Sequence, residues 1–252
     1  MLRLYIYLIF NVVLLKQISS MSTKKQAQRL WREADAVCFD VDSTVCVDEA
    51  IDELAEFCGV GPQVAACTVK AMGGGMTFRE ALIQRLDIMQ PSHKIVEDFI
   101  ALRPPRLSSG IRDLMNVLKA KNIMVFLVSG GFRNIIAPVA NELGIAQENI
   151  YANTLLFNED GSYAGFDTNE PTSETGGKPR VIQLIRNKYS FKTLVFVGDG
   201  VTDMETYPPA DAFIGYGGNV VRSKVKDEAA WYVTDFRQLI EEFSDDDIYI
   251  SN

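Results

Sequence analysis

The chain has 252 residues, of which 47% are hydrophobic and 10% aromatic, so it can bury a full core and is not intrinsically disordered. Its formal net charge of −8 argues against the broad basic face that nucleic-acid binding requires, and no nucleic-acid partner is expected. A single histidine, His93, excludes metal sites built from several histidines. Catalysis therefore has to depend mainly on carboxylates.

The first 20 residues differ in character from the rest of the chain. Residues Leu2 to Leu15 are mostly apolar, with interruptions at Arg3 and Asn11, which resembles a weak secretory signal and is too short for a clear membrane span. From Met21 the sequence is polar and helix-forming, as at the start of a cytosolic protein. We expect a cytoplasmic protein with an N-terminal extension, residues 1–20. A cleaved signal or an organelle-targeting segment is the alternative.

The cysteines indicate a reducing compartment. They form no CxxC pair and all lie in the first third of the chain, at Cys38, Cys46, Cys58 and Cys67. Cys38 falls inside a predicted core strand, where cysteine behaves as a small hydrophobic residue. We expect four free thiols.

The first half of the chain predicts one strand followed by helices. A helix over Gln26–Glu33 leads into a continuously apolar run that starts at Ala36 and ends at Asp40, which is typical of a strand buried on both faces. Between this strand and Pro105 the sequence favours helices only, over Ala50–Cys58, Val64–Met72, Thr77–Met89 and Ser92–Leu102. Residues 47–105 are therefore predicted to form a helical insertion over the strand ends.

The second half alternates between helices and strands. Helices are predicted over Gly110–Lys121, Phe132–Leu143, 176–188 and Phe236–Phe243, and strands over Ile123–Val128, Leu194–Val197, Ala212–Ile214 and Trp231–Val233. Glu159-Asp160-Gly161 predicts a hairpin between Thr154–Phe157 and Tyr163–Phe166. This alternation is typical of an α/β, doubly wound parallel sheet. We expect residues 21–46 and 106–252 to form that core.

Polar residues follow the three clearest predicted strands. Asp40 and Asp42 follow the first, Ser129 follows the second, and Asp199 and Asp203 follow the third. In open α/β sheets, chemistry gathers beyond the carboxyl ends of the strands. We therefore expect these five side chains to lie along one edge of the sheet.

This grouping indicates phosphoryl chemistry. Clustered carboxylates repel one another, and a hard cation such as Mg²⁺ relieves the repulsion with Asp40 and Asp199 as its natural charged ligands. A carboxylate is also an established nucleophile that forms aspartyl-phosphates. Ser129, neighbouring backbone N–H groups and Lys178 are candidates for binding the phosphoryl group.

The ordered motifs resemble the four motifs of the haloacid-dehalogenase superfamily. They are Asp40-Val41-Asp42-Ser43-Thr44, Ser129-Gly130-Gly131-Phe132, Lys178 and Gly198-Asp199-Gly200-Val201-Thr202-Asp203. Further segments make the chain similar to the phosphoserine phosphatases of that superfamily from about Leu30 to Phe243, namely Ile51-Asp52-Glu53-Leu54, Ala71-Met72-Gly73-Gly74 and Asp211-Ala212-Phe213-Ile214-Gly215. The resemblance implies a Rossmann-like core with a small helical cap, residues 47–105, inserted after the first strand.

The resemblance also implies an activity and catalytic roles. The implied reaction is the Mg²⁺-dependent hydrolysis of O-phospho-L-serine through an aspartyl-phosphate, in L-serine biosynthesis. Asp40 would be the nucleophile and a metal ligand, and Asp42 the general acid and then base, with its backbone carbonyl on the metal. Asp199 would complete the ligands, and Asp203 would orient a metal-bound water.

The implied substrate contacts divide between the sheet edge and the cap. Those at the phosphate are Ser129, Gly130, Gly131 and Lys178. In the cap, Glu49 would pair with the substrate ammonium and Arg85 with its carboxylate, while Met72, Gly73 and Thr202 would line the pocket. A homodimer is expected only from the resemblance.

Without the resemblance, several of these residues have plainer interpretations. Glu49 and Arg85 are then solvated helix charges, Met72 is a core residue, and Lys178 is an exposed charge at a helix start, where the helix dipole disfavours it. Two other functions also stay open. One is a phosphatase for another small phosphomonoester, and the other is a non-catalytic phosphate- or protein-binding module.

Overall fold

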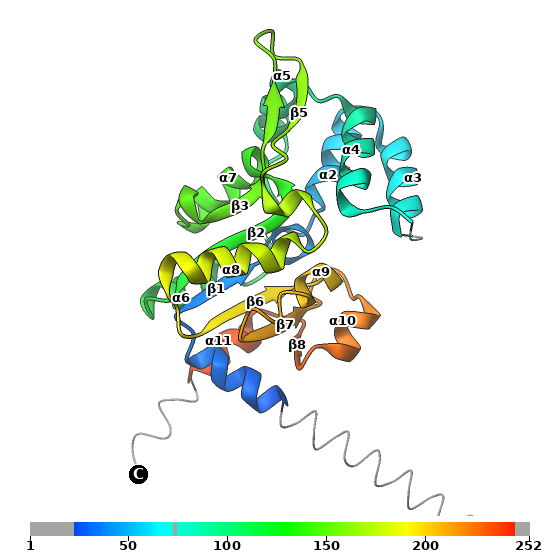
Figure 1. Cartoon of the computed structure of the whole chain (residues 1–252). Helices are drawn as coiled ribbons and strands as arrows, with labels where there is room; N and C mark the ends of the chain where they lie inside the picture. The colour runs from blue at the N-terminus through cyan, green and yellow to red at the C-terminus, as the bar shows by residue number, and fades with distance from the viewer. Residues whose placement is uncertain (1–22, 73–74, 245–252) are drawn as a thin grey trace, which may run out of the picture.

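A six-stranded parallel sheet lies at the centre of the computed structural model, which describes residues 23–72 and 75–244 (Figure 1). Its strand order is β3-β2-β1-β6-β7-β8. The strands are β1 (Ala36–Phe39), β2 (Met124–Phe132), β3 (Ile150–Asn153), β6 (Leu194–Gly198), β7 (Ala212–Tyr216) and β8 (Trp231–Val233). The predicted doubly wound α/β fold is confirmed.

Strand β1 lies in the middle of this sheet, between β2 and β6. Its side chains alternate between the two faces, so that Val37 and Phe39 join one hydrophobic cluster while Ala36 and Cys38 join the other. All four residues are fully buried. A strand that is covered on both faces needs an uninterrupted apolar run, and this run made β1 predictable from the sequence.

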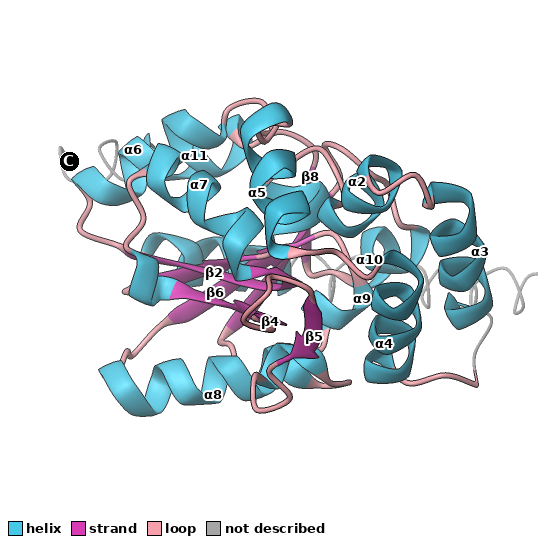
Figure 2. Ribbon diagram, turned by 90° about the horizontal axis from the view of Figure 1, so that it is seen from above, coloured by secondary structure: helices cyan, strands magenta, loops and turns pink. Residues whose placement is uncertain are grey.

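Helices cover both faces of the sheet (Figure 2). One face is covered by residues 23–32 and by α6 (Ile111–Ala120), α7 (Arg133–Leu143) and α11 (Arg237–Ser244). The other face is covered by α8 (Gly177–Tyr189) and α10 (Ser223–Glu228). The indole of Trp31 donates a hydrogen bond of 2.9 Å to the Leu239 carbonyl, which ties the first described helix to the last.

Four helices inserted between β1 and α6 form a separate layer (Figure 1). They are α2 (Ala50–Phe57), α3 (Gly61–Met72), α4 (Phe78–Met89) and α5 (His93–Leu102). Thr77 and Glu80 form a capping box at the start of α4, and the Ser92 hydroxyl caps α5. The predicted helical insert is confirmed.

A third hydrophobic cluster joins this insert to the predicted hairpin, β4 (Leu155–Phe157) and β5 (Tyr163–Phe166). Phe99 of α5 packs in this cluster with Leu155 and Phe166. The backbone N–H of His93 also donates a 2.9 Å hydrogen bond to the Gly161 carbonyl at the hairpin tip. The hairpin therefore extends from the core to support the insert.

The structure differs from the predicted elements in a few places. Strand β3, helix α10 and the short helix α9 (Val201–Met204) were not predicted. Strand β2 continues beyond Val128 to Phe132, because its pairing with β3 resumes after a register shift between these two residues. All four cysteines are free thiols, as expected.

Among the helices of residues 23–72 and 75–244, none combines the length and the apolar content that crossing a bilayer requires. The expected N-terminal extension, residues 1–20, lies outside the described part of the chain. So does Gly73 of the predicted pocket, and of Met72 the structure describes only its place at the end of α3.

Candidate active site

Asp40 lies at the carboxyl end of the central strand, where its backbone N–H still donates to the Val197 carbonyl of β6 at 3.0 Å. Oδ1 of Asp40 accepts a 2.8 Å hydrogen bond from the N–H of Val41. The chain then turns sharply, with Ser43 in the left-handed region at φ 55°. Asp40 is therefore buried and fixed in orientation at the edge of the sheet.

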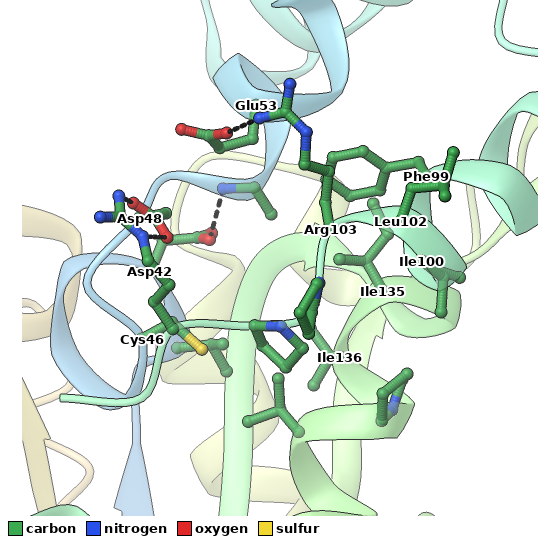
Figure 3. Close-up of a pocket in the computed structure, with 17 residues that line it drawn as sticks. Asp42, Cys46, Asp48, Glu53, Phe99, Ile100, Leu102, Arg103, Ile135 and Ile136 are labelled. Atoms are coloured by element: carbon green, nitrogen blue, oxygen red, sulfur yellow. Dashed lines mark hydrogen bonds and ion pairs between the residues drawn. The ribbon is translucent and has the colours of Figure 1, made fainter. Parts of the chain in front are cut away.

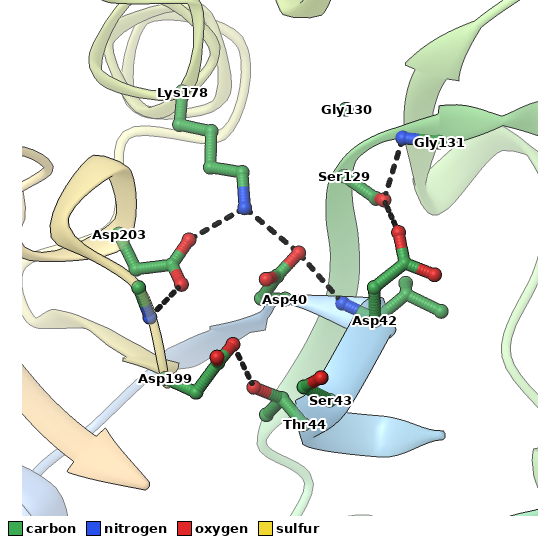
Figure 4. A network of polar contacts seen from close by, with 12 residues as sticks. Asp40, Asp42, Ser43, Thr44, Ser129, Gly130, Gly131, Lys178, Asp199 and Asp203 are labelled. Carbon is green, nitrogen blue, oxygen red and sulfur yellow. Dashed lines mark hydrogen bonds and ion pairs between the residues drawn. The ribbon is translucent and has the colours of Figure 1, made fainter. Parts of the chain in front are cut away.

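Two more carboxylates reach the same point from the loop after β6 (Figure 4). Asp199 follows the strand directly, and Asp203 in the first turn of α9 accepts a 2.8 Å hydrogen bond from the Gly200 N–H. A Cβ at Gly198 would lie 2.4 Å from Cγ of Asp203, so only glycine allows this close approach. Carboxylate oxygens of Asp40, Asp199 and Asp203 lie within 4.8 Å of one another, and all three residues are buried.

Lys178 lies between two of these carboxylates. Its Nζ atom is 2.7 Å from Oδ1 of Asp40 and 2.5 Å from Oδ1 of Asp203, and its side chain is 11% exposed. Burial opposes the charge of Lys178, but the carboxylates of Asp203 and Asp40 outweigh this effect and raise its pKa. The lysine at the start of α8 is therefore a buried partner of the acidic cluster, and the alternative of an exposed helix charge is wrong.

Lys178 does not offset all of the acidity of the site. Burial, followed by the charge of Asp203, raises the pKa of Asp40, and the same two effects raise the pKa of Asp199. A divalent cation among these oxygens would stabilise their ionised forms, and oxygen donors are the ligands that hard cations prefer. The three carboxylates therefore fit a hard divalent metal ion.

Asp42 belongs to the same loop but has different surroundings. Its Oδ1 accepts a 2.9 Å hydrogen bond from the N–H of Ala50, and its Oδ2 lies 3.5 Å from the Ser129 hydroxyl. Burial, followed by the nearby charge of Glu49, raises the pKa of Asp42 to about 7. A carboxyl group with a pKa near neutrality can both give and take a proton at physiological pH.

The Ser129-Gly130-Gly131 segment occupies the register shift in β2. The Gly131 N–H donates a 2.9 Å hydrogen bond to the Ser129 hydroxyl. A Cβ at Gly130 would lie 2.7 Å from the ring of Phe78, and one at Gly131 would lie 3.2 Å from Oδ2 of Asp42. These two glycines therefore let the insert and the Asp42 loop approach the backbone of β2.

A cavity of about 610 Å³ lies between the sheet edge and the helical insert. Glu49, just before α2, and Arg85 of α4 contribute its charged residues on the insert side. The predicted site residues that line it are Asp40, Asp42, Glu49, Arg85, Gly130, Gly131, Lys178, Asp199, Thr202 and Asp203. Ser129 is buried beside it. The structure thus brings together the predicted residues that it describes with their side chains.

Sequence analysis missed Arg222, which lies in the loop after β7. Its Nε atom is 2.6 Å from Oδ2 of Asp199, and its Nη2 atom is 3.2 Å from Oε1 of Glu49. Arg222 therefore links the acidic cluster to the insert. The only hint in the sequence was that Arg222 lies in the loop after a predicted strand, although further from the strand end than Asp40, Ser129 or Asp199.

A second cavity of about 420 Å³ opens between α5, α7 and the segment that joins the insert to α6 (Figure 3). Its polar side carries two ion pairs, one between Arg103 and Glu53 at 3.4 Å and one between Arg106 and Asp48. Asp42 is the one predicted site residue among those that line it. The three-carboxylate cluster faces the larger cavity, so we assign the active site there.

Comparison with known proteins agrees with this geometry. The sequence pattern of haloacid dehalogenase-like hydrolases matches residues 34–210. The chain belongs to this family. It is 54% identical over 220 residues to "Phosphoserine phosphatase" of Bos taurus, covering 87% of this chain and 98% of the relative.

Two further relatives extend the comparison. One is "Phosphoserine phosphatase, chloroplastic" of Arabidopsis thaliana, 54% identical over 218 residues, with 86% of this chain and 74% of the relative covered. The other is a solved structure described as a phospho-aspartyl intermediate analogue of phosphoserine phosphatase, with a TM-score of 0.70 and 25% identity. That match covers 82% of this chain and 98% of the solved one.

Proposed function

We propose that this chain is a Mg²⁺-dependent phosphatase that hydrolyses O-phospho-L-serine to L-serine and phosphate, in L-serine biosynthesis. The observation that carries the proposal is the cavity itself, because three clustered carboxylates and Lys178 lie on one side of it and the opposite charges of Glu49 and Arg85 on the other. The two parts match a phosphate group and an amino-acid group joined in one small substrate. The names of the Bos taurus and Arabidopsis thaliana relatives support the same substrate.

Asp40 is the proposed nucleophile. One of its carboxylate oxygens forms a bond to phosphorus while the bond between phosphorus and the serine oxygen breaks, which leaves an aspartyl-phosphate. The hydrogen bond from Val41 and the ion pair with Lys178 hold this carboxylate in a fixed orientation. Positioning of this kind lowers the entropic part of the barrier.

Asp42 is the proposed general acid and base. It gives its proton to the serine oxygen as that oxygen leaves, and in the second half of the reaction it takes a proton from the water that attacks the aspartyl-phosphate. Its pKa of about 7 suits both transfers. The N–H of Ala50 holds one of its oxygens and leaves the other beside Ser129.

Asp40, Asp199 and the backbone carbonyl of Asp42 are the proposed ligands of Mg²⁺, with Asp203 acting through a bound water. When bound, the ion would supply positive charge that screens the attacking carboxylate from the phosphoryl oxygens. The buried and mutually close positions of Asp40, Asp199 and Asp203 support this assignment.

Phosphate binding is proposed for Ser129, Gly130, Gly131 and Lys178, and amino-acid binding for the insert, which we propose acts as a cap domain over residues 47–105. Glu49 would pair with the substrate ammonium and Arg85 with its carboxylate, while Met72, Gly73 and Thr202 would complete the lining. We further propose that the protein works in the cytoplasm and forms a homodimer.

Phosphate release from a panel of phosphorylated metabolites tests the proposal. The protein from Met21 onward should release phosphate from phosphoserine far faster than from phosphothreonine or phosphoethanolamine, and only with Mg²⁺ present. Asp40→Asn should abolish turnover, because an amide cannot act as this nucleophile. Near-normal turnover by Asp40→Asn would contradict the mechanism, and faster release from another metabolite would replace the substrate.

A further inference from the structure

Two chain segments join the insert to the core, and we call them the cap junction: residues 43–47 leave the core and residues 105–108 return to it. Cys46 and Leu107 form an antiparallel bridge, the Val47 N–H donates to the Arg106 carbonyl at 2.8 Å, and the Ser108 N–H donates to the Val45 carbonyl at 2.9 Å. The insert is covalently joined to the sheet only by these two segments, so a movement of the insert relative to the sheet changes the backbone of one or both of them.

Asn219, in the loop after β7, contacts both segments of the cap junction. Its side-chain nitrogen lies 3.0 Å from the Ser43 carbonyl and 3.3 Å from the Cys46 carbonyl, both on the outgoing segment. The same nitrogen lies 2.6 Å from the Ser108 hydroxyl on the returning segment. That hydroxyl in turn donates a 2.6 Å hydrogen bond to the Thr44 carbonyl, and both Ser108 and Thr44 are buried.

The loop that carries Asn219 is itself held closely against the core. A Cβ at Gly217 would lie 1.8 Å from the Tyr232 hydroxyl, and one at Gly218 would lie 2.2 Å from the Tyr216 hydroxyl, so these positions require glycine. The Gly217 N–H also donates a 2.8 Å hydrogen bond to the Val233 carbonyl. Three residues after Asn219, Arg222 binds Asp199 and Glu49.

From these contacts we infer that Asn219 is a positioning residue that fixes the position of the insert over the active site. This inference rests on the proposed function. The side-chain nitrogen of Asn219 donates to the backbone carbonyls of Ser43 and Cys46, on the segment that directly follows Asp42, and through Ser108 it holds the segment that returns from the insert. It touches no predicted catalytic side chain. Its effect on catalysis therefore passes through the position of the Asp42 loop and of the insert that carries Glu49 and Arg85.

Two substitutions at this position separate hydrogen bonding from packing. Asn219→Ala removes the donor, whereas Asn219→Asp keeps the shape but turns a carboxylate oxygen toward two carbonyl oxygens. If the side-chain nitrogen of Asn219 bridges the two segments, both variants should lose phosphoserine hydrolysis. We expect kcat/KM to fall by roughly tenfold in Asn219→Ala, the scale of a lost buried hydrogen bond, and further in Asn219→Asp. The loss should be smaller with an aryl phosphate, which lacks the amino and carboxyl groups that the insert would bind.

Hydrogen exchange gives a second measurement that does not depend on the substrate. The amides of Val47 and Ser108, which pair across the cap junction, should exchange faster in both variants than in the wild type. Asn158→Ala serves as the matched control, because Asn158 is an exposed hairpin residue that bonds Ser162, far from the junction in sequence. If Asn219→Ala does not fold, Ser108→Ala, which removes the shared hydroxyl, is measured in its place.

Unchanged exchange of these amides would overturn the inference, and so would an Asn219→Asp variant that is more active than Asn219→Ala. Equal losses on both substrates, with unchanged exchange, would likewise show that Asn219 has only a general structural role. If the wild-type protein releases no phosphate from phosphoserine, the proposed substrate fails. The exchange rates then still decide whether Asn219 holds the junction.

Discussion

Nζ of Lys178 lies 2.7 Å from Oδ1 of Asp40, so the proposed nucleophile is paired with a buried cation before any substrate arrives. The same nitrogen contacts Asp203, and Lys178 therefore compensates two of the three clustered carboxylates. This arrangement explains how a lysine is tolerated at the first turn of α8, where the helix dipole alone disfavours it.

Lys178→Met should reduce kcat by on the order of 10²–10³, because a preorganised positive group beside the transferred phosphoryl is lost. The metal-free protein should also lose roughly 3 kcal/mol of stability, since removing one partner leaves buried carboxylates uncompensated. Steady-state kinetics and chemical denaturation measure the two effects. The exposed Lys119 of α6 provides the control, and Lys119→Met should leave both values unchanged. Full activity in Lys178→Met would contradict the proposed role.

Asp42→Asn should slow phosphoserine turnover by on the order of 10²–10⁴, the usual contribution of general acid–base catalysis. In this variant, the rate at which the aspartyl-phosphate forms should depend on the leaving group of the substrate, whereas the rate at which it is hydrolysed should not. An aryl phosphate has a good leaving group that needs no proton, so its phenol should appear in a rapid burst while hydrolysis of the aspartyl-phosphate stays slow. Rapid-mixing measurements detect this burst. Its absence, combined with an equal slowing of both substrates, would assign Asp42 a purely structural role.

Arg85→Ala should impair phosphoserine hydrolysis far more than aryl phosphate hydrolysis, because the proposed partner of Arg85 is the substrate carboxylate. The loss of one charge-assisted hydrogen bond corresponds to roughly tenfold or more in kcat/KM. Arg112→Ala is a suitable control, since Arg112 lies on α6 and pairs with Glu142 on the surface. Comparable losses on the two substrates would rule out a contact between Arg85 and the carboxylate.

The raised pKa of Asp42 predicts how pH affects the metal-free protein. The pKa of Asp42 is about 7 in the folded protein and returns to its ordinary value of 3.8 on unfolding. Between these pH values the folded protein therefore holds a proton that the unfolded chain has released. Stability should therefore fall as pH rises from 4 to 7 and change little above that range on account of this group. Asp40 and Asp199 act in the same direction.

Thermal unfolding in the presence of a chelator measures this dependence. Asp42→Asn removes the titrating group, so the variant should gain stability relative to the wild type as pH rises toward 7. A divalent cation should reduce the dependence, because it stabilises the ionised carboxylates. A difference between variant and wild type that does not change with pH would show that Asp42 titrates normally in the folded protein.

Gly130→Ala should interfere with the contact between the insert and β2, because the new Cβ would lie 2.7 Å from the ring of Phe78. Such overpacking costs about 1–3 kcal/mol, which we expect as a loss in kcat/KM on phosphoserine of about tenfold or more. Replacing the ring by a smaller side chain, in the double variant Gly130→Ala, Phe78→Leu, should recover part of that loss. A double-mutant cycle measures the coupling, and simple additivity would place the cause elsewhere.

The sheet-edge part of the site could be predicted from the sequence because each residue follows an apolar run of recognisable length. Asp40 and Asp199 end strands that are buried on both faces, and strands of this kind bring their ends to one edge of a parallel sheet. The helices of the insert were equally clear, since Ser92 and Thr77 supply ordinary N-caps.

The contacts between distant loops could not be predicted in this way. Arg222 contacts Glu49, which is 173 residues away in the sequence, and no local sequence pattern predicts such a contact. Strand β3, which has four residues and pairs with β2 alone at the edge of the sheet, was also missed. The extension of β2 through Gly131 was missed because glycines ordinarily indicate the end of a strand.

The bridge between Cys46 and Leu107 means that the chain departs from the sheet and rejoins it at neighbouring points. The intervening segment could therefore be transplanted from one relative to another without rerouting any strand. If the insert binds the amino-acid part of the substrate, as we propose, changes confined to this segment would alter substrate choice while the strands and their carboxylates stay in place.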